Sequence, residues 1–178
     1  MILSLDISTA IIGWATLDNG KLEYGAWDLR DDKLFGGDLF LKTAFVKDQL
    51  EVFKDVTKVI VEKPFTVFSG KKAQSSAHTM AILQRFNGMV SYIAFDQFGI
   101  TPEYITVQEA RSKCGIKIIR PPKGKKKSQV DTKRQIVKFL IDTEPQFRVE
   151  LTPKGNPKPQ YYDIADAIVL LKSQVPQS

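Results

Sequence analysis

The first thirty residues alternate between hydrophobic runs and short polar breaks, a pattern typical of β-strands. An apolar run over 1–7 fits a buried strand, and strand-like runs over 11–18 and 21–29 follow it. The last two runs are separated by Asn19 and Gly20, the strongest short-range signal for a hairpin turn. The chain is therefore expected to open with an antiparallel meander.

After residue 30 the spacing becomes helical and then alternates with shorter strand-like segments. The run "KVIVE" is rich in β-branched residues and is stopped by Pro64, which indicates a strand ending at Glu62. The other segments predict a strand over 102–107 and helices over about 33–53, 74–98, 108–115, 131–142 and 161–173. The helix over 33–53 rests on apolar residues at helical intervals: Leu34, Leu39, Phe40, Ala44, Phe45, Leu50 and Phe53.

Together these elements predict an α/β fold built on a five-stranded mixed sheet. The meander supplies antiparallel strands, and the helical connection before the fourth strand allows that strand to run parallel to the first. Enough helices follow to cover both faces of the sheet. A length of 178 residues suits one domain over 1–178, and no internal repeat or linker divides the chain.

The predicted helix over 74–98 is hydrophobic around more of its circumference than one core face requires. Its apolar positions are Met80, Ile82, Leu83, Phe86, Met89, Val90, Ile93, Ala94 and Phe98. Two interpretations remain open: part of this surface packs on a partner subunit, or the helix is central and buried on two sides.

Composition and targeting signals exclude several classes of protein. A hydrophobic content of 43% and a charged content of 26% are ordinary for a globular domain. The single cysteine, Cys114, excludes an internal disulfide and a thiolate zinc cluster, which favours a reducing cytoplasm. The opening "MILSLDIS" has neither the basic region nor the long apolar stretch of a signal peptide, and no segment is long enough to span a membrane.

The net charge of +6 is concentrated in one part of the chain. Between Arg111 and Lys138 there are eleven Lys and Arg residues and one acid, Asp131, whereas the rest of the chain is net acidic. A local basic patch on an acidic body indicates a surface for a polyanion, most often nucleic acid. A basic loop that is merely solvated is the alternative interpretation.

Four carboxylates lie in apolar surroundings and are expected to meet. Asp6 lies near the end of the first strand and Glu62 at the end of the fourth, while Asp163 and Asp166 share one face of the last helix. If the two strands are parallel neighbours, their carboxyl ends share one sheet edge, where ligand sites of such sheets collect. Taken singly, each acid is more simply a helix cap or a surface partner.

Clustered carboxylates repel one another unless cations lie among them. Oxygen ligands without histidine or thiolate partners select hard ions such as Mg²⁺ or Mn²⁺. Two such ions at a spacing of roughly 3.5–4 Å hydrolyse phosphodiesters in many nucleases. With the basic patch, the four acids therefore favour a two-metal phosphodiesterase.

Several motifs resemble the RuvC-type Holliday junction resolvases of the RNase H-like superfamily, in the same order along the chain. "LSLDISTAIIGWATLD" resembles that family's opening strands, with Asp6, Ser8 and Gly13 in the family pattern; a glycine inside a strand also indicates a bulge or a close backbone approach. "VIVEKPF" matches the strand that carries the family's glutamate, here Glu62. "YYDIADAIVLL" is similar to the family's terminal D-x-x-D-A helix. In its compactness and lysine content, the sequence resembles the phage-encoded branch of this family.

The resemblance implies an RNase H-like fold, a divalent metal held by the four acids, and a homodimer joined mainly through the helix around 74–98. It implies that "KKSQV" brings Lys127 into the active site and that Phe65 contacts bases at the junction centre. Each subunit is then expected to cut one strand of a four-way DNA junction, in the host cytoplasm if the gene is phage-borne. The residues expected to grip the DNA arms and phosphates are Arg111, Lys113, Lys123, Lys125, Lys126, Lys133 and Arg134.

Three other functions are weighed against a resolvase. The same fold and acids could serve a nuclease for flaps, forks or RNA–DNA hybrids. "LDIST…G" also resembles the phosphate loop of sugar-kinase and actin-like ATPases, but those proteins need a second related half, for which 178 residues without a repeat leave no room. A DNA-binding protein without nuclease activity would be expected to have lost an acid, and none of the four is missing.

Overall fold

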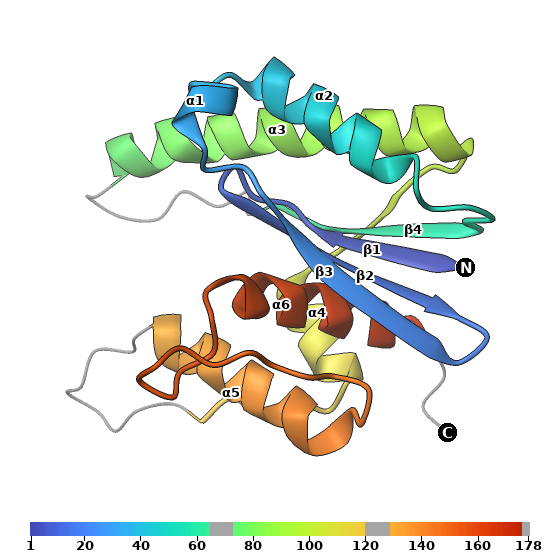
Figure 1. Cartoon of the computed structure of the whole chain (residues 1–178), viewed down its shortest axis with the longest axis vertical. Helices are drawn as coiled ribbons and strands as arrows, with labels where there is room; N and C mark the ends of the chain where they lie inside the picture. The colour runs from blue at the N-terminus through green and yellow to red at the C-terminus, as the bar shows by residue number, and fades with distance from the viewer. Residues whose placement is uncertain (65–72, 120–128, 176–178) are drawn as a thin grey trace.

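The computed structural model describes residues 1–64, 73–119 and 129–175 and contains one five-stranded sheet between two layers of helices (Figure 1). The strand order is β3-β2-β1-β4-β5. The strands are β1 (Ile2–Asp6), β2 (Ile11–Asp18), β3 (Lys21–Asp28), β4 (Lys58–Glu62) and β5 (Glu103–Ile105). The helices are α1 (Asp32–Phe35), α2 (Leu39–Leu50), α3 (Ala73–Phe98), α4 (Val107–Lys113), α5 (Gln129–Thr143) and α6 (Gln160–Lys172).

The strand pairing confirms the mixed sheet and its antiparallel opening. β1 pairs with β2 and β2 with β3 in antiparallel fashion, and Asn19 and Gly20 form the turn with positive φ angles of 47° and 81°. β4 runs parallel to β1 and β5 runs parallel to β4. The first and fourth strands are therefore parallel neighbours, as the sequence predicts.

Alternating side chains divide the core between the two faces of the sheet. Leu3 and Leu5 of β1 lie in the hydrophobic cluster beneath α2 and α3, whereas Ser4 between them points to the opposite face and donates a hydrogen bond to the carbonyl oxygen of Ala167 in α6 at 2.8 Å. In β4, Val59 likewise faces the α2–α3 layer. Period-two patterning thus places α2 and α3 on one side and α4, α5 and α6 on the other (Figure 1).

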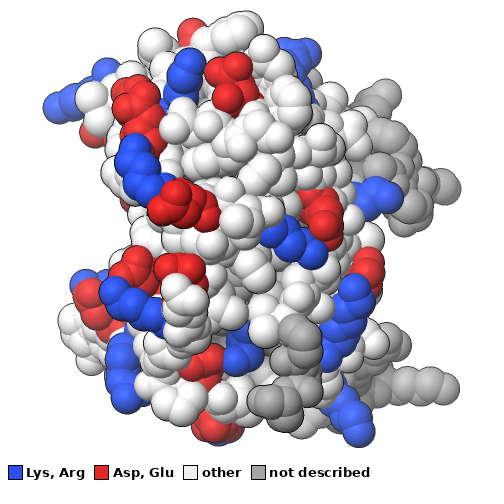
Figure 2. Space-filling model, turned by 90° about the vertical axis from the view of Figure 1, so that its right-hand side faces the viewer, with Lys and Arg blue, Asp and Glu red and all other residues white. Residues whose placement is uncertain are grey.

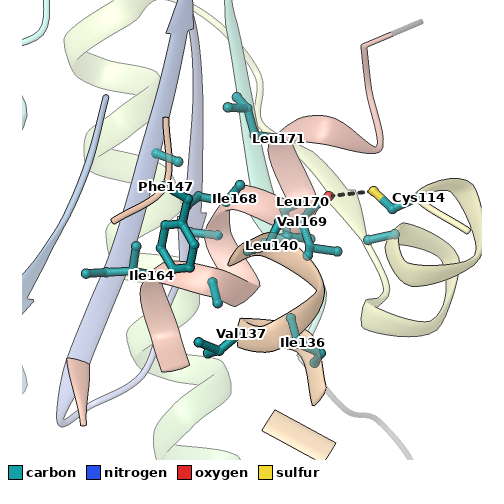
Figure 3. Close-up of a cluster of buried hydrophobic side chains, with 14 of the residues drawn as sticks. Cys114, Ile136, Val137, Leu140, Phe147, Ile164, Ile168, Val169, Leu170 and Leu171 are labelled. Atoms are coloured by element: carbon teal, nitrogen blue, oxygen red, sulfur yellow. Dashed lines mark hydrogen bonds between the residues drawn. The ribbon is translucent and has the colours of Figure 1, made fainter. Parts of the chain in front are cut away.

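The last helix, α6, lies against the sheet as the central element of the second core. Nine of its residues are buried. Figure 3 shows how its apolar side chains meet those of α5 and the loop residue Phe147, and how the buried Cys114 thiol donates to the carbonyl oxygen of Val169 at 3.5 Å. The hydrophobic run that surrounds the two aspartates is therefore explained by burial on nearly every side of the helix.

The predicted helix over 33–53 is wrong in two respects. The chain forms two helices there, because Gly36 and Gly37 adopt positive φ angles of 51° and 75° and Asp38 caps a new helix. The side facing the core also differs, because Phe40 is 77% exposed whereas Lys42 is 8% exposed. The Lys42 ammonium donates to the carbonyl oxygen of Thr9 at 2.6 Å, so a polar contact rather than an apolar one anchors this turn of α2.

The long helix α3 is buried on one side only, so the interpretation of burial on two sides within the chain is wrong for its described side chains. Phe86, Val90 and Ala94 lie in the core beneath the helix. On its outer face Tyr92 is 65% exposed and Phe95 is 45% exposed. Packing of this outer face on a partner subunit stays a prediction.

The remaining elements agree with the sequence to within a few residues at each end. No helix among the described residues is long and apolar enough to cross a membrane.

Candidate active site

The parallel pairing of β1 and β4 places Asp6 beside Glu62. Leu5 pairs with Val61 across the two strands, so the next residues, Asp6 and Glu62, end the strands at the same edge of the sheet. Both carboxyl groups line one pocket of about 510 Å³. The two strand-end acids therefore meet as the sequence predicts.

The other two predicted acids reach this pocket from the first turns of α6. Asp163 and Asp166 lie three residues apart and both line the pocket, and Asp166 is only 8% exposed. The pocket residues, taken together, are Asp6, Ile7, Ser8, Glu62, Pro64, Leu83, Asn87, Val107, Gln108, Arg111, Thr132, Lys133, Asp163 and Asp166. All four carboxylates predicted from the sequence thus share one site.

Gly13 allows α6 to approach the sheet closely enough to deliver these aspartates. A Cβ atom at this position would lie 2.2 Å from the carbonyl oxygen of Asp163 and 2.7 Å from the nitrogen of Ile164. Gly13 also pairs directly with Asp6 across β1 and β2. Gly13 therefore marks a close approach of two backbones and not a bulge. These are the two alternatives that the sequence leaves open.

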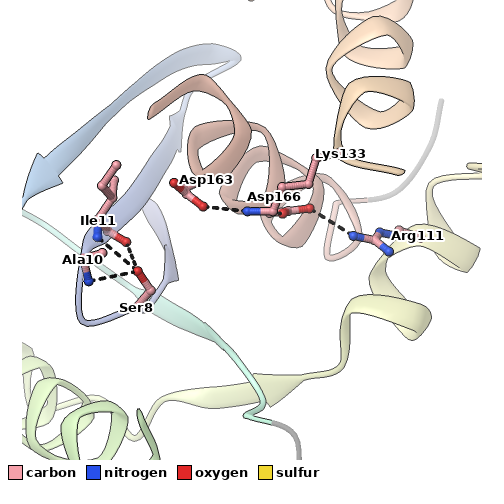
Figure 4. Close-up of polar contacts among 7 residues, drawn as sticks. All are labelled: Ser8, Ala10, Ile11, Arg111, Lys133, Asp163 and Asp166. Carbon is pink, nitrogen blue, oxygen red and sulfur yellow. Dashed lines mark hydrogen bonds and ion pairs between the residues drawn. The ribbon is translucent and has the colours of Figure 1, made fainter. Parts of the chain in front are cut away.

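Two cations lie among the acids and hold those of α6 (Figure 4). The Lys133 ammonium, from α5, lies 2.8 Å from Oδ1 of Asp163 and 3.9 Å from Oδ2 of Asp166. The Arg111 guanidinium, from α4, lies 3.3 Å from Oδ1 of Asp166. Each aspartate of α6 therefore has at least one positive partner within the chain.

Among the residues that the structure describes, Asp6 and Glu62 have no such direct cationic partner, and the pKa of each is raised. Burial raises the pKa of Asp6 well above its usual range, and the charges of Glu62 and Asp166 raise it further. Burial also raises the pKa of Glu62, although its hydrogen bond with Asp6 acts in the opposite direction. The hydrogen bond between the two carboxyl groups therefore adds to the rise in the pKa of Asp6 and opposes the rise in the pKa of Glu62.

In the part of the site formed by α6, the cations oppose the effect of burial on the carboxyl pKa. Burial raises the pKa of Asp166, while Lys133 and Arg111 limit the rise. For Lys133, burial lowers the pKa of the ammonium, but Asp163, Asp166 and Asp6 raise it by more, so the net shift is upward. The ammonium therefore stays charged within the carboxylate cluster.

The donor set fits a hard divalent cation, but its side chains are not gathered into a cage. Among residues 1–64, 73–119 and 129–175, no three His, Cys, Asp or Glu side chains converge closely enough to form one. Asp163 and Asp166 are instead paired with Lys133 and Arg111. Four carboxyl groups around one pocket still match the chemistry of Mg²⁺ or Mn²⁺ ligation.

Two polar residues support the ends of the strands that carry the acids. The Ser8 hydroxyl accepts from the backbone N–H groups of Ala10 and Ile11 and donates to the Ile11 carbonyl at 2.7 Å, so it satisfies the backbone just beyond β1 (Figure 4). The buried Asn87 of α3 donates to the Glu62 carbonyl oxygen at 3.2 Å. Both bonds position the backbone beside the catalytic candidates.

The DNA-contact candidates fall into three groups. Arg111 and Lys133, expected on phosphates, lie inside the carboxylate pocket. Lys113 forms an ion pair with Glu109 at 3.0 Å, and Arg134 is exposed on α5. The other candidates lie outside the described residues, so their predicted roles stay predictions: Phe65, Lys123, Lys125, Lys126 and Lys127.

On the face of the molecule that Figure 2 shows, the described side chains do not form a basic patch. In the view of Figure 2, Lys and Arg side chains alternate with Asp and Glu side chains instead of gathering by sign. The densest part of the predicted basic patch is the lysine run at 123–127, which lies within the undescribed range 120–128. The patch therefore stays a prediction from the sequence.

The sequence pattern missed that Arg111 and Lys133 belong to the acid cluster, and it missed Asn87 altogether. Lys133 lies in a run of basic residues that suggests only a charged surface. A signal was available in the rule that buried carboxylates need partners, but the choice of partner depends on how α4 and α5 pack against α6. Asn87 has no sequence signal beyond being a polar residue on the apolar face of its helix.

Comparison with known proteins identifies the fold but no family. No protein-family model matches the sequence, and no curated protein matches it significantly. A solved structure of Thermus thermophilus RuvC in complex with a Holliday junction substrate is similar, with a TM-score of 0.54 and 13% identity over 97% of this chain and 90% of that one. A second structure of Thermus thermophilus RuvC gives a TM-score of 0.51 at 13% identity, covering 97% and 91% of the two chains. The chain therefore has a RuvC-like, RNase H-like fold.

Proposed function

We propose that this protein is a metal-dependent, structure-selective DNA endonuclease that resolves four-way (Holliday) junctions by paired nicks. The observation that carries the proposal is the meeting of Asp6, Glu62, Asp163 and Asp166 at one pocket on a RuvC-like sheet. The similar Thermus thermophilus protein was solved with a Holliday junction substrate, which supports a branched DNA as the ligand.

The four carboxylates are proposed to hold two Mg²⁺ ions, for which Mn²⁺ can substitute. When bound, the ions would supply a nucleophilic water and stabilise the leaving oxygen of a phosphodiester. Burial raises the pKa values of Asp6 and Glu62, so any proton bound there would be released when metal binds, since ligating carboxylates must be ionised. The ordered strand ends and the Gly13 contact keep the four oxygen donors in place.

The basic residues are proposed to bind the DNA around this centre. Lys127 would orient the scissile phosphate, and Phe65 would stack at the open centre of the junction. Arg111, Lys113 and Arg134 would contact phosphates near the pocket mouth. The lysines at 123, 125 and 126 would grip the arms through charge alone, which raises affinity without adding sequence information.

A homodimer joined through α3 is proposed to match the symmetry of the substrate. Paired nicks require two active sites related by a two-fold axis. The exposed aromatic residues of the outer face, Tyr92 and Phe95, lie on the helix predicted to join the subunits. The lysine-rich segment favours the phage-encoded branch of such enzymes and hence action on DNA in a host cytoplasm.

The experiment that tests the proposal compares Mg²⁺-dependent cleavage of a mobile four-way junction, a linear duplex, a flap and a fork of matched sequence. Paired nicks confined to the junction, and lost in Asp166→Asn, are the expected result. Cleavage of all branched substrates would replace the resolvase with a broader branched-DNA nuclease. Binding without cleavage in Mg²⁺ and Mn²⁺ would contradict an enzymatic role.

Specificity for RNA–DNA hybrids is the other outcome that the fold allows. A hybrid duplex in the same assay distinguishes it. Cleavage of the hybrid in preference to the junction would move the activity to that substrate while leaving the assignment of the four acids intact.

A further inference from the structure

Lys133 is the one described ammonium that contacts two of the four carboxylates. Its Nζ atom lies 2.8 Å from Asp163 and 3.9 Å from Asp166, so it bridges the two acids of α6. The lysine side chain is 29% exposed, whereas the Asp166 side chain is 10% exposed. Figure 4 shows the Lys133 side chain directed at Asp163 and Asp166.

This placement creates a conflict with the metal ions of the proposed function. A divalent ion needs the same carboxylate oxygens that the ammonium contacts, and two cations on the same oxygens repel each other. A lysine has a flexible four-carbon stem and a compact charge, so the head group can move while α5 stays in place. The Lys133 ammonium must therefore move away from Asp163 when a metal ion binds there. While the ammonium stays in place, no metal ion can bind at Asp163.

Arg111 is a poor candidate for the same exchange. Its contact with Asp166 is longer, at 3.3 Å, and its Nε atom is buried without a hydrogen-bond partner in the described structure. A planar guanidinium held in this way is positioned by packing as much as by the carboxylate. The exchangeable cation of the site is therefore Lys133.

We propose that Lys133 is a built-in counter-cation that holds Asp163 and Asp166 in the metal-free protein, competes with the metal, and is transferred to a DNA phosphate when metal enters. This inference rests on the proposed nuclease function and specifies how its site is regulated. The displaced ammonium then needs another negatively charged partner, which a DNA phosphate provides. Metal and DNA therefore bind cooperatively, and each raises the affinity of the other by the same factor.

The first test is a calorimetric titration of Mn²⁺ into DNA-free protein at fixed ionic strength. Lys133→Met is expected to bind Mn²⁺ about ten- to a hundredfold more tightly than the unmodified protein, the range over which neighbours of metal ligands change affinity. The matched control is Lys138→Met, which removes an exposed lysine of the same helix that pairs with Asp142 at 2.8 Å. The control should leave the Mn²⁺ affinity unchanged.

The outcomes separate this inference from the proposed function. If the unmodified protein and Lys133→Met bind Mn²⁺ equally well, Lys133 is a fixed structural partner and the inference is overturned, while the nuclease proposal stands. If neither protein binds Mn²⁺, the metal site of the proposed function fails, and the inference that rests on it fails with it.

Removal of the ammonium could also prevent folding without metal, because Arg111 would then be the one cationic partner of the four acids among the described residues. Lys133→Gln keeps a hydrogen-bond donor for Asp163 and removes the charge, so it provides a second variant. Thermal unfolding in EDTA should show a lower midpoint for this variant than for the unmodified protein, and Mn²⁺ should raise that midpoint by more than it raises that of the unmodified protein. An equal increase in the unfolding midpoint of the two proteins on addition of Mn²⁺ would contradict the exchange of the Lys133 ammonium for the metal ion.

The second test measures the coupling between metal and DNA. Mn²⁺ is titrated with and without a nicked duplex, which is the product of the proposed reaction and so is not turned over. The unmodified protein should bind Mn²⁺ at least about fivefold more tightly with DNA than without it, which lies within the usual range of coupling. In Lys133→Met, DNA should increase the Mn²⁺ affinity much less. An undiminished factor in Lys133→Met would overturn the transfer of the ammonium to phosphate.

Discussion

Gly13 has a larger effect on the site than its size suggests, because it sets the distance between α6 and the sheet. The position that a Cβ atom would occupy is 2.2 Å from a backbone oxygen, which no side-chain rotation can relieve. Gly25 in the next strand offers a comparison, since a Cβ atom there would lie 2.6 Å from the Trp14 ring, a side chain that can move.

We predict that Gly13→Ala destabilises the protein by about 3 kcal/mol or more, at the upper end of the cost of overpacking, because α6 must shift away from β2. Gly25→Ala should cost less, roughly 1–2 kcal/mol, since the Trp14 ring can adjust. Urea unfolding measures both values. Equal losses, or no loss for Gly13→Ala, would contradict the backbone contact.

The raised pKa values of Asp6 and Glu62 make the stability of the metal-free protein depend on pH. A carboxyl group with a raised pKa in the folded state binds more protons there than in the unfolded chain, so the free energy of unfolding falls as pH rises. The loss begins near the ordinary carboxyl pKa of about 4 and continues through the raised values.

Unfolding in EDTA at pH 5 and pH 8 is therefore expected to show the protein less stable at the higher pH. Asp6→Asn should reduce this difference and raise the stability at pH 8, by about 1.4 kcal/mol for each unit by which the Asp6 pKa is raised. The exposed Asp96 provides the control, since Asp96→Asn should leave the pH dependence unchanged. A pH dependence that persists in Asp6→Asn would place its origin elsewhere.

At the scale of the elements, α6 is held near both of its ends by ion pairs with neighbouring segments. Lys133 of α5 and Arg111 of α4 contact the acids near its start. Near its end, Lys172 pairs with the buried Glu144, just beyond α5, at 2.5 Å. The core between these ends is hydrophobic, so the ion pairs position the helix along its axis while apolar contacts hold it on the sheet.

Loss of the C-terminal pair should therefore destabilise the protein without changing the chemistry of the site. Lys172→Met leaves Glu144 buried and uncompensated, which is expected to cost about 1–3 kcal/mol, below the value for a fully buried pair because Lys172 is partly exposed. Lys138→Met, at an exposed pair, should cost no more than about 0.5 kcal/mol. Urea unfolding distinguishes these values, and an equal cost for both would show that burial of Glu144 has no effect.

Prediction succeeded for most elements because their local patterns are strong, and it failed where local signals conflicted. The strands β1, β2 and β4 were defined by apolar runs and by the Asn19–Gly20 turn. The helix over 33–53 was divided because two successive glycines in left-handed conformations outweigh the periodicity of the apolar residues around them.

At the scale of the whole molecule, the outer face of α3 is the surface on which a second subunit is expected. Phe95→Glu places a charge on this face and should convert a dimer into a monomer, because an unpaired charge in an interface costs several kcal/mol. Phe40→Glu is the matched control, since Phe40 is exposed on α2 and lies outside the proposed interface. Sedimentation velocity measures both variants, and an intact Phe95→Glu dimer would rule out this interface.

The lysine-rich segment is expected to supply the salt-dependent part of DNA binding. Replacing Lys123, Lys125 and Lys126 with alanine should reduce the slope of log affinity against log salt by up to about 3, since each phosphate contact contributes about 0.9. A control with the same change in charge replaces three exposed lysines elsewhere: Lys33, Lys47 and Lys54. Equal losses in the two variants would show that net charge, and not this segment, is responsible.

The sequence by itself determined the strands, the long helices and the identity of the four acids. Strand ends and helix faces follow from short-range periodicity, so Asp6, Glu62, Asp163 and Asp166 could be placed on their elements without coordinates. The meeting of Asp6 and Glu62 at one sheet edge also followed, because parallel neighbouring strands end together.

Only the tertiary structure decided how these acids are compensated. The pairing of Lys133 with Asp163, and of Arg111 with Asp166, joins residues 30 and 55 positions apart on separate helices. The approach that Gly13 permits is likewise a contact between distant backbones. Such contacts depend on how helices pack on the sheet, and packing is decided by the fit of whole surfaces, which no local pattern of residues records.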